Sequence, residues 1–210
     1  MTVGAAAPFY LHPAAEPVAW RALLGGRLDL DWAVVNVADG PGGGYDEHYY
    51  GPALAGGCLT PLVGYVDLAY GRRPLADVLD DVAAWPSWYG VRDVLLDCTP
   101  AEDVADVLAT VTAVRAAGAA RVVLNPGRVP DPAIQACGDV TCVIETDWRI
   151  YPTLDHAAGP GVTWHLVHSV PATQLAAAWA STVRRGADHA WVTDGRLPNP
   201  WRVLPTGWGP

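Results

Sequence analysis

The chain has 210 residues, of which 51% are hydrophobic and 17% are charged, and its formal net charge is -9 at pH 7. This composition is typical of a folded globular chain and excludes a disordered one. No run of basic residues occurs, which argues against nucleic-acid binding, because that requires clustered Lys and Arg to neutralise phosphates. We expect residues 1–210 to form one domain, since the length suits a single core.

The N-terminal stretch MTVGAAAPFYLHP has neither a basic segment nor a long apolar one, so it predicts no signal peptide. No window approaches the roughly 18 uninterrupted apolar residues of a membrane span. The four cysteines are scattered and lack C-x-x-C spacing, which predicts reduced thiols and no structural zinc. We also expect no cofactor. We therefore expect a cytoplasmic protein, or a secreted one if a leader has been removed. The bias towards Ala, Gly, Arg and Trp fits a bacterial source.

Short apolar runs bounded by chain breakers recur along the sequence and predict eight strands. The runs alternate little, as is typical of strands that are covered on both faces of a parallel sheet. They are PFYLH (8–12), DWAVVNV (31–37), LTPLVGYV (59–66), VRDVLLD (91–97), ARVVLN (120–125), DVTCVIE (139–145), GVTWHLVH (161–168) and DHAWVTD (188–194).

Helices are predicted between most of these strands, at 16–25, 46–57, 74–85, 101–116, 130–137 and 171–185. Residues 146–160, between the sixth and seventh strands, hold one poor helical turn. Eight strands alternating with helices predict an α/β fold of the (β/α)8 TIM-barrel type, compact, with short helices and loops. A doubly wound open sheet is the alternative, but LHPAAEP after the first strand is not the glycine-rich loop that a nucleotide would need.

Almost every predicted strand ends in a polar or titratable residue. In a TIM barrel these ends form the face that carries the chemistry. One such residue alone most often caps the following helix, but Tyr, His and Glu are poor caps, so the set predicts a site at one rim. Its members are His12, Asn36, Tyr65, Asp67, Asp97, Asn125, Glu145, His168, Thr193 and Asp194.

Two carboxylates of this set stand out, Asp97 at the end of the fourth predicted strand and Glu145 at the end of the sixth. Paired acids across a cleft suit the cleavage of a glycosidic bond, in which one protonates the leaving oxygen and the other attacks or activates water. The alternative is a structural ion pair between one acid and Arg72, Arg73 or Arg149.

Two further kinds of chemistry are weaker candidates. His12, His168, Asp97 and Glu145 could form a mixed metal site, but no metal-binding spacing supports it. Cys98 could act as a nucleophile, but the adjacent Asp97 would raise the pKa of the thiol. We expect Cys98 to be a small buried residue and the site to hold no metal.

Nine stretches follow one another in a recognisable order along nearly the whole chain. They are PFYLHP (8–13), VVNVADGPGG (34–43), LVGYVDLAYGRRP (62–74), VLLDC (94–98), VVLNPG (122–127), CVIE (142–145), LVHSVP (166–171), WVTD (191–194) and LPTGW (204–208). They include the specific combination of N-x-x-x-G-P-G, G-Y-V-x-x-x-Y-G-x-R and N-P-G. Taken together, these stretches resemble the spherulin 4-like proteins (spherulation-specific family 4).

The resemblance implies a TIM-like barrel related to glycoside hydrolases of galactosamine-containing polysaccharides. It implies that Asp97 and Glu145 are the catalytic carboxylates, whereas Cys98 stands where the family has a second acid. Tyr10, Asn36, Tyr65, Tyr70, Arg72 and Asn125 match groove positions. With the strand-end residues and Trp148, the expected substrate-binding set is Tyr10, His12, Asn36, Tyr65, Asp67, Tyr70, Arg72, Asn125, Trp148, His168 and Asp194.

Three functions follow as expectations. The first is a glycoside hydrolase-like enzyme that acts on galactosamine-containing glycans. The second is an intracellular enzyme of bacterial specialised metabolism, such as a cyclase, isomerase or lyase, which would need a closed pocket for a small molecule. The third is a non-catalytic sugar-binding relative, because Cys98 replaces an acid. The expected partner is an oligosaccharide or small molecule, and the sequence leaves the oligomeric state open.

Overall fold

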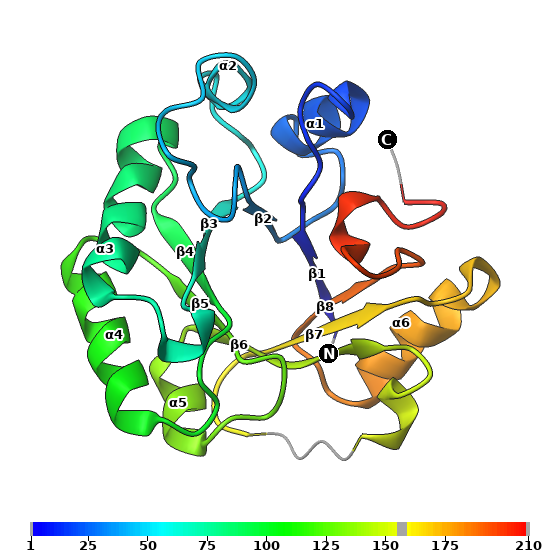
Figure 1. Ribbon diagram of the computed structural model, residues 1–210. Helices are drawn as coiled ribbons and strands as arrows, with labels where there is room; N and C mark the ends of the chain where they lie inside the picture. Colours follow the sequence, from blue (N-terminus) through cyan, green and yellow to red (C-terminus); the bar gives the residue numbers. More distant parts are fainter. Residues whose placement is uncertain (1, 155–158, 209–210) are drawn as a thin grey trace.

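A computed structural model describes residues 2–154 and 159–208 and contains a closed barrel of eight parallel strands, each paired with the next and β8 with β1 (Figure 1). The predicted (β/α)8 fold is therefore confirmed. The strands are β1 (Gly4–Pro8), β2 (Trp32–Val35), β3 (Leu62–Asp67), β4 (Asp93–Asp97), β5 (Val122–Asn125), β6 (Val140–Asp147), β7 (Thr163–His168) and β8 (His189–Val192).

Helices and short turns surround the barrel. The α-helices are α1 (Pro17–Leu24), α2 (Tyr50–Leu54), α3 (Leu75–Ala84), α4 (Val104–Ala116), α5 (Pro132–Cys137) and α6 (Leu175–Arg184). A π-helical turn, η2 (Trp85–Tyr89), extends α3, and 3-10 turns form η1 (Ala69–Gly71), η3 (Tyr151–Thr153), η4 (Ala172–Gln174) and η5 (Pro200–Arg202). The poor turn expected within 146–160 corresponds to η3, and residues 155–158 of that segment lie outside the described ones.

Two predicted elements differ from those observed. The first strand is GAAAP at Gly4–Pro8 and not PFYLH at 8–12, because the alanines pair with β2 in the register Ala6↔Trp32 and Ala7↔Ala33. Alanine has little strand propensity of its own, so local sequence did not reveal it. The helix expected at 46–57 is only five residues long in the structure, where it forms α2. The segment is rich in Gly and Pro, and both are weak helix formers.

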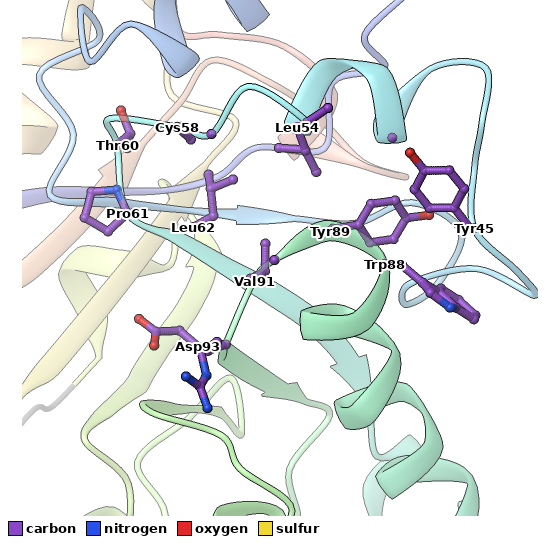
Figure 2. A pocket seen from close by; sticks show the side chains of 15 residues that line it. Tyr45, Leu54, Cys58, Thr60, Pro61, Leu62, Trp88, Tyr89, Val91 and Asp93 are labelled. Atoms are coloured by element: carbon purple, nitrogen blue, oxygen red, sulfur yellow. The ribbon is translucent and has the colours of Figure 1, made fainter.

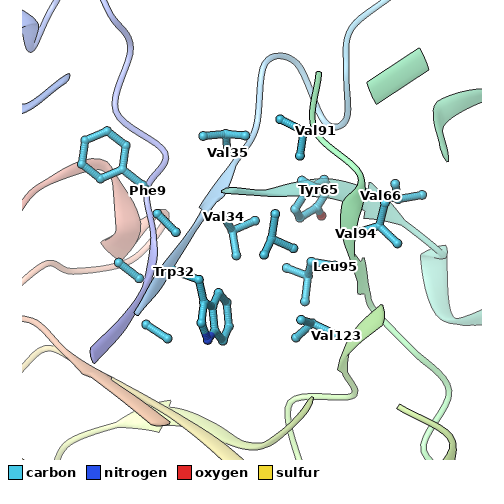
Figure 3. Packing of buried hydrophobic residues seen from close by; sticks show 14 of the residues in the cluster. Phe9, Trp32, Val34, Val35, Tyr65, Val66, Val91, Val94, Leu95 and Val123 are labelled. Carbon is cyan, nitrogen blue, oxygen red and sulfur yellow. The ribbon is translucent and has the colours of Figure 1, made fainter. Parts of the chain in front are cut away.

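Side chains that point inward from the strands fill the barrel. Trp32 and Trp164 are fully buried and meet edge to face, 4.6 Å between ring centroids, and Trp164 Nε1 donates to the carbonyl of Ala6 at 3.0 Å. Figure 3 shows Trp32 with Val34, Tyr65, Leu95 and Val123 in this core. The small residues of β1 leave the space that the two indoles occupy, which explains why a poor strand sequence closes the barrel.

Among the residues that the structure describes, no α-helix follows β8, and the segment up to Trp208 takes that position. It lies between α1 and α6 (Figure 1). Trp208 anchors it, since its Nε1 donates to the carbonyl of Leu28 at 3.1 Å and its ring packs on Trp191 at 5.0 Å and on Trp179 at 5.9 Å. In the described part of the chain, no helix is long and apolar enough to cross a membrane.

Gly64 on β3 provides a test of the packing between the barrel and its outer layer. A Cβ at Gly64 would overlap the ring of Trp85, which is fully buried and donates to the carbonyl of Tyr65 at 2.9 Å. Gly64→Ala should therefore lower the free energy of unfolding by about 1–3 kcal/mol in a denaturant titration. Gly43→Ala is the matched control, because nothing lies within 4 Å of that position. Equal stability of the two variants would contradict this account of the packing.

Candidate active site

Two adjoining cavities open at the carboxyl ends of the strands. The first has a volume of about 220 Å³ and the second about 470 Å³, and both are lined by Asp97, Asn125, Glu145 and His168. The first also contacts Tyr10, Asn36, Asp39, Tyr65, Trp164 and Leu197–Trp201. The second continues along Tyr70, Cys98, Pro126, Gly127 and Arg128. Because these four residues line both cavities, the two form one site, which we call the barrel-mouth site.

The amide of Asn125 bridges the two predicted catalytic carboxylates. Its Nδ2 donates to Asp97 Oδ1 and to Glu145 Oε2, each at 2.7 Å. The register of β4 and β5 pairs Asp97 directly with Asn125, and this places their inward-facing side chains side by side. Since both oxygens lie 2.7 Å from one nitrogen, they cannot be more than twice that distance apart.

The N-P-G motif explains how this amide is oriented. Asn125 Oδ1 accepts a hydrogen bond from the backbone N–H of Gly127 at 2.9 Å, so the amide must direct its NH2 group towards the acids. Gly127 has a φ of +69°, a left-handed conformation that glycine adopts without steric cost. Its carbonyl in turn accepts from the N–H of Glu145 at 3.0 Å. One tight turn thus positions the bridge and the backbone of the second acid.

Tyrosines surround the first acid. Tyr65 donates its hydroxyl to Asp97 Oδ2 at 2.7 Å, and Tyr10 packs edge to face on Tyr65 with 5.8 Å between centroids. Burial, and then the charge of Asp97, raise the pKa of both phenols, so they remain hydrogen-bond donors across the physiological range. The amide of Asn36 lines the same cavity and accepts from the N–H of Gly40 at 3.0 Å, which fixes the loop after β2.

Trp201 and His168 also line the site. A hydrogen bond from Trp201 reaches Glu145 and favours its ionised form. His168 packs edge to face on Trp201 at 6.0 Å, and its Nδ1 lies 3.0 Å from Ser169 Oγ. Burial lowers the pKa of His168, which keeps its ring neutral at pH 7.

Both carboxyl groups hold their protons more tightly than exposed acids do. Burial is the main cause of the raised pKa of Asp97 and of Glu145, and hydrogen bonds oppose it in both cases. Asp97 accepts from Tyr65, from the N–H of Cys98 and from Asn125. Glu145 accepts from Asn125 and Trp201 and also feels the charge of Asp97. Asp97 is therefore the better supported anion, and Glu145 is the better proton carrier.

Cys98 is a neutral thiol at the edge of the barrel-mouth site. Burial, followed by the charges of Asp97 and Asp67, raises its pKa to about 12, so the thiolate that a nucleophile requires is not populated at neutral pH. Its Sγ lies 4.0 Å from Asp97 Oδ2. The expectation that Cys98 is not an activated nucleophile agrees with this environment, although the residue is half-buried and lines the cavity.

Strained backbone gathers around the same site. Among the described residues, six that are not glycine have positive φ, and five of these follow the carboxyl ends of strands: Asp39, Ala69, Tyr70, Cys98 and Ser169. Such conformations cost free energy and persist where the surroundings enforce them, often at functional sites. The consecutive pair Ala69 and Tyr70, with φ of 47° and 56°, directs a 59% exposed Tyr70 ring to the rim.

Five residues of the predicted substrate-binding set do not line the barrel-mouth site. His12 lies four residues beyond β1, exposed, against Tyr49 and Tyr50, because the first strand ends earlier than predicted. Asp67 accepts from the N–H of Ala69 at 2.7 Å and thus caps a turn. Arg72 lies over the ring of Tyr70.

The other two are held by neighbours outside the cavity. Trp148 stacks on Tyr151 and donates to Gln174 at 2.7 Å. Asp194 accepts from the N–H of Thr206 at 3.1 Å and so anchors the C-terminal segment. The members of the set that do line the site are Tyr10, Asn36, Tyr65, Tyr70, Asn125 and His168.

The structural ion pairs considered as an alternative role for the acids are formed by other residues. Arg73 pairs with Asp81 at 2.6 Å, and Arg149 pairs with Asp147 at 3.0 Å. No salt bridge to Asp97 or Glu145 occurs within residues 2–154 and 159–208. Over the same residues, no group of three His, Cys, Asp or Glu side chains is arranged to hold a metal ion.

Sequence reasoning missed one wall of the cavity. Asp39 and the segment Leu197–Trp201, which includes a cis peptide bond before Pro198, line it but follow strands instead of ending them. For Asp39, the D-G-P-G pattern at 39–42 was a usable signal, because Asp before Gly favours a turn. No local sequence pattern predicted that Trp201 lines the site, because its position depends on how the segment after β8 folds back over the barrel.

Glu145→Gln should stabilise the protein at neutral pH. Folding raises the pKa of Glu145 above its ordinary value near 4.5. As the pH rises from 4.5 through this raised pKa, wild type therefore loses stability relative to the variant. The variant's gain in the free energy of unfolding is about 1.4 kcal/mol for each unit by which the folded-state pKa exceeds 4.5, and this gain disappears below pH 4.5. Thermal unfolding from pH 4 to 8 measures it. Glu102→Gln, at an exposed acid, is the control, and an equal profile for both variants would refute the prediction.

Trp201→Phe should raise the pKa of Glu145 further. The variant keeps an aromatic ring but removes the only N–H of the side chain, and this N–H stabilises the ionised carboxylate. Carboxyl-carbon NMR titration of Glu145 provides the measurement. An unchanged or lowered midpoint would show that Trp201 has no hydrogen-bonding role there.

Comparison with known proteins identifies the family. The model of the family described as Spherulation-specific family 4 matches residues 5–210. Among solved structures, the crystal structure of Aspergillus clavatus Sph3 in complex with GalNAc superposes with a TM-score of 0.79 and 25% sequence identity, covering 99% of this chain and 94% of that one. A search of curated proteins finds no match. The extent of the family match, together with the shared fold, shows that the chain belongs to spherulation-specific family 4.

Proposed function

We propose that the protein is a glycoside hydrolase-like enzyme that binds galactosamine-containing glycans at the barrel-mouth site. The observation that carries the proposal is the pair of buried acids held within reach of each other by the Asn125 amide. The structural likeness to a protein solved with GalNAc supports a sugar ligand.

The two acids can divide the chemistry between them. Glu145, the better proton carrier, would protonate the glycosidic oxygen as the bond to the anomeric carbon breaks. Asp97, the better supported anion, would face the positive charge that develops on the sugar ring, or form a bond to the anomeric carbon, before water completes the reaction. Asp97 Oδ1 and Glu145 Oε2 lie within twice 2.7 Å of each other, which is closer than the roughly 6.5–9.5 Å of inverting enzymes and therefore favours a retaining reaction.

A sugar-binding protein without turnover is the second candidate, and Cys98 is the observation that favours it. A thiol with a pKa of about 12 cannot replace the acid that the family resemblance leads one to expect there. The barrel-mouth site would then retain its aromatic and amide contacts to sugar but lack one participant in catalysis.

Incubation with acetylated and de-acetylated galactosamine oligomers, followed by analysis of chain length, tests hydrolysis. We expect wild type to shorten an oligomer and Glu145→Gln to lose roughly 10²–10⁴-fold in rate, the usual contribution of a general acid. Asp147→Asn is the matched control, since Asp147 lies on the same strand but pairs with Arg149 outside the cavity. Full activity of Glu145→Gln would refute the proposed role.

Substitution of Cys98 separates the two candidate functions. If the site already catalyses hydrolysis, Cys98→Ala should leave the rate within a few-fold of wild type, because the neutral thiol carries no charge at neutral pH. Cys98→Glu should raise the rate or create activity where wild type has none, since it adds a titratable acid beside Asp97. Binding of oligomers by isothermal calorimetry, without shortening by wild type or Cys98→Glu, would favour the sugar-binding protein.

A further inference from the structure

The hydroxyl of Tyr65 is engaged within the protein, although the family resemblance places Tyr65 in the substrate groove. A phenol has one proton to donate, and Tyr65 donates it to Asp97 Oδ2 at 2.7 Å. The residue is only 9% exposed. A sugar oxygen therefore cannot accept a hydrogen bond from Tyr65 unless the bond to the acid is broken.

Tyr65 reaches Asp97 from a deeper layer of the barrel. The register of β3 and β4 pairs Tyr65 with Leu95 and Asp67 with Asp97 (Figure 3 shows Tyr65 and Leu95). The Cα of Tyr65 thus lies two residues before the end of its strand, and the length of the phenol ring carries the hydroxyl up to the carboxylate. A phenylalanine at this position would keep the ring and lose only this contact.

The ring and the backbone of Tyr65 are held from two sides. Tyr10 packs edge to face on the ring, with 5.8 Å between centroids, and Trp85 Nε1 donates to the carbonyl of Tyr65 at 2.9 Å. Trp85 belongs to η2, which also borders a pocket of about 640 Å³ on the flank of the barrel, where Tyr89 stacks on Tyr45 (Figure 2). This pocket shares no described residue with the barrel-mouth site, so η2 supports Tyr65 from outside that site.

The other groups that hold Asp97 are not specific to it. Its Oδ1 accepts from Asn125, which donates at the same distance to Glu145. A further donor is the backbone N–H of Cys98, which any residue at that position would provide. Among the described residues, Tyr65 is therefore the side chain whose hydrogen bond distinguishes Asp97 from the second acid.

We propose that Tyr65 is a positioning residue for the proposed reaction, which holds the carboxylate of Asp97 in one orientation, as the anion that meets the anomeric carbon of the sugar. It acts through Asp97 and not through contact with substrate. Tyr10 differs, because its hydroxyl has no hydrogen-bond partner within residues 2–154 and 159–208 and lines the first cavity, where it is free to contact sugar. This inference rests on the proposed function, since it takes the role of Asp97 from that reaction.

The titratable and charged groups around Asp97 determine how its ionisation responds to the loss of the Tyr65 hydroxyl. They are Tyr10, Asp39, Tyr65, Asp67, Tyr70, Cys98, Arg128, Glu145 and His168. The hydrogen bond from Tyr65 favours the anion, whereas the charge of Asp67 opposes it. The cation Arg128 is paired with Glu102 at 3.0 Å. Removal of the hydroxyl should therefore raise the pKa of Asp97, so that its anion is lost at a higher pH as the pH falls.

Tyr65→Phe and Tyr10→Phe form a matched pair, since each keeps its ring and loses one hydroxyl. On an oligomer that wild type shortens, Tyr65→Phe should lower kcat by roughly 10–10²-fold, because the acid is no longer held in place, and leave KM within about twofold. The acidic limb of kcat/KM should move up by about 1–2 pH units, as expected when a charged group loses a hydrogen bond. Tyr10→Phe should raise KM and leave that limb in place.

Carboxyl-carbon NMR titration of Asp97 measures the same shift without turnover. Tyr49→Phe, at a 47% exposed ring outside the site, should change neither the titration nor the kinetics. Circular dichroism checks folding. If Tyr65→Phe unfolds, fluorotyrosine at position 65 keeps the test valid, because its hydroxyl is a stronger donor and should move the midpoint of Asp97 in the opposite direction.

The outcomes separate this inference from the proposed function. A raised KM for Tyr65→Phe, with kcat and the acidic limb unchanged, would show that Tyr65 binds substrate directly, and it would overturn the inference while hydrolysis by wild type stands. An unmoved midpoint of Asp97 would overturn it as well. If wild type shortens no oligomer, the proposed function itself fails and the inference falls with it.

Discussion

The hydrogen bonds from one amide group to two buried acids are the constraint on which the barrel-mouth site depends. Two carboxylates at this depth repel each other and resist ionisation, and Asn125 offsets part of that cost by donating to both. The bridge requires the turn at Gly127, the register between β4 and β5, and the hydroxyl of Tyr65 on the far side of Asp97. The same strands that close the barrel therefore also fix the distance between the two acids.

The sequence predicted the barrel because seven of the eight strands carry strong apolar runs that overlap those observed. The exception is β1, where alanines serve to accommodate Trp32 and Trp164, a requirement set by distant residues. Likewise Asp97, Asn125 and Glu145 were predictable from their places at strand ends. Trp201 and Asp39 were not, because their positions depend on loops that return to the barrel mouth. His12 does not line the site, because β1 begins and ends earlier in the chain than the strand predicted at 8–12.

The residue after the bridging amide has a consequence for the chemical lifetime of the protein. Asparagine side chains deamidate when the next backbone nitrogen attacks the side-chain carbonyl to form a succinimide, and glycine in that place accelerates the reaction. Asn125 is followed by Pro126, whose ring nitrogen carries no hydrogen and cannot close that intermediate. Conversion of Asn125 to aspartate would put a third acid between Asp97 and Glu145 and abolish the bridge. The order Asn-Pro-Gly, instead of Asn-Gly, thus protects the amide of Asn125 against deamidation through a succinimide.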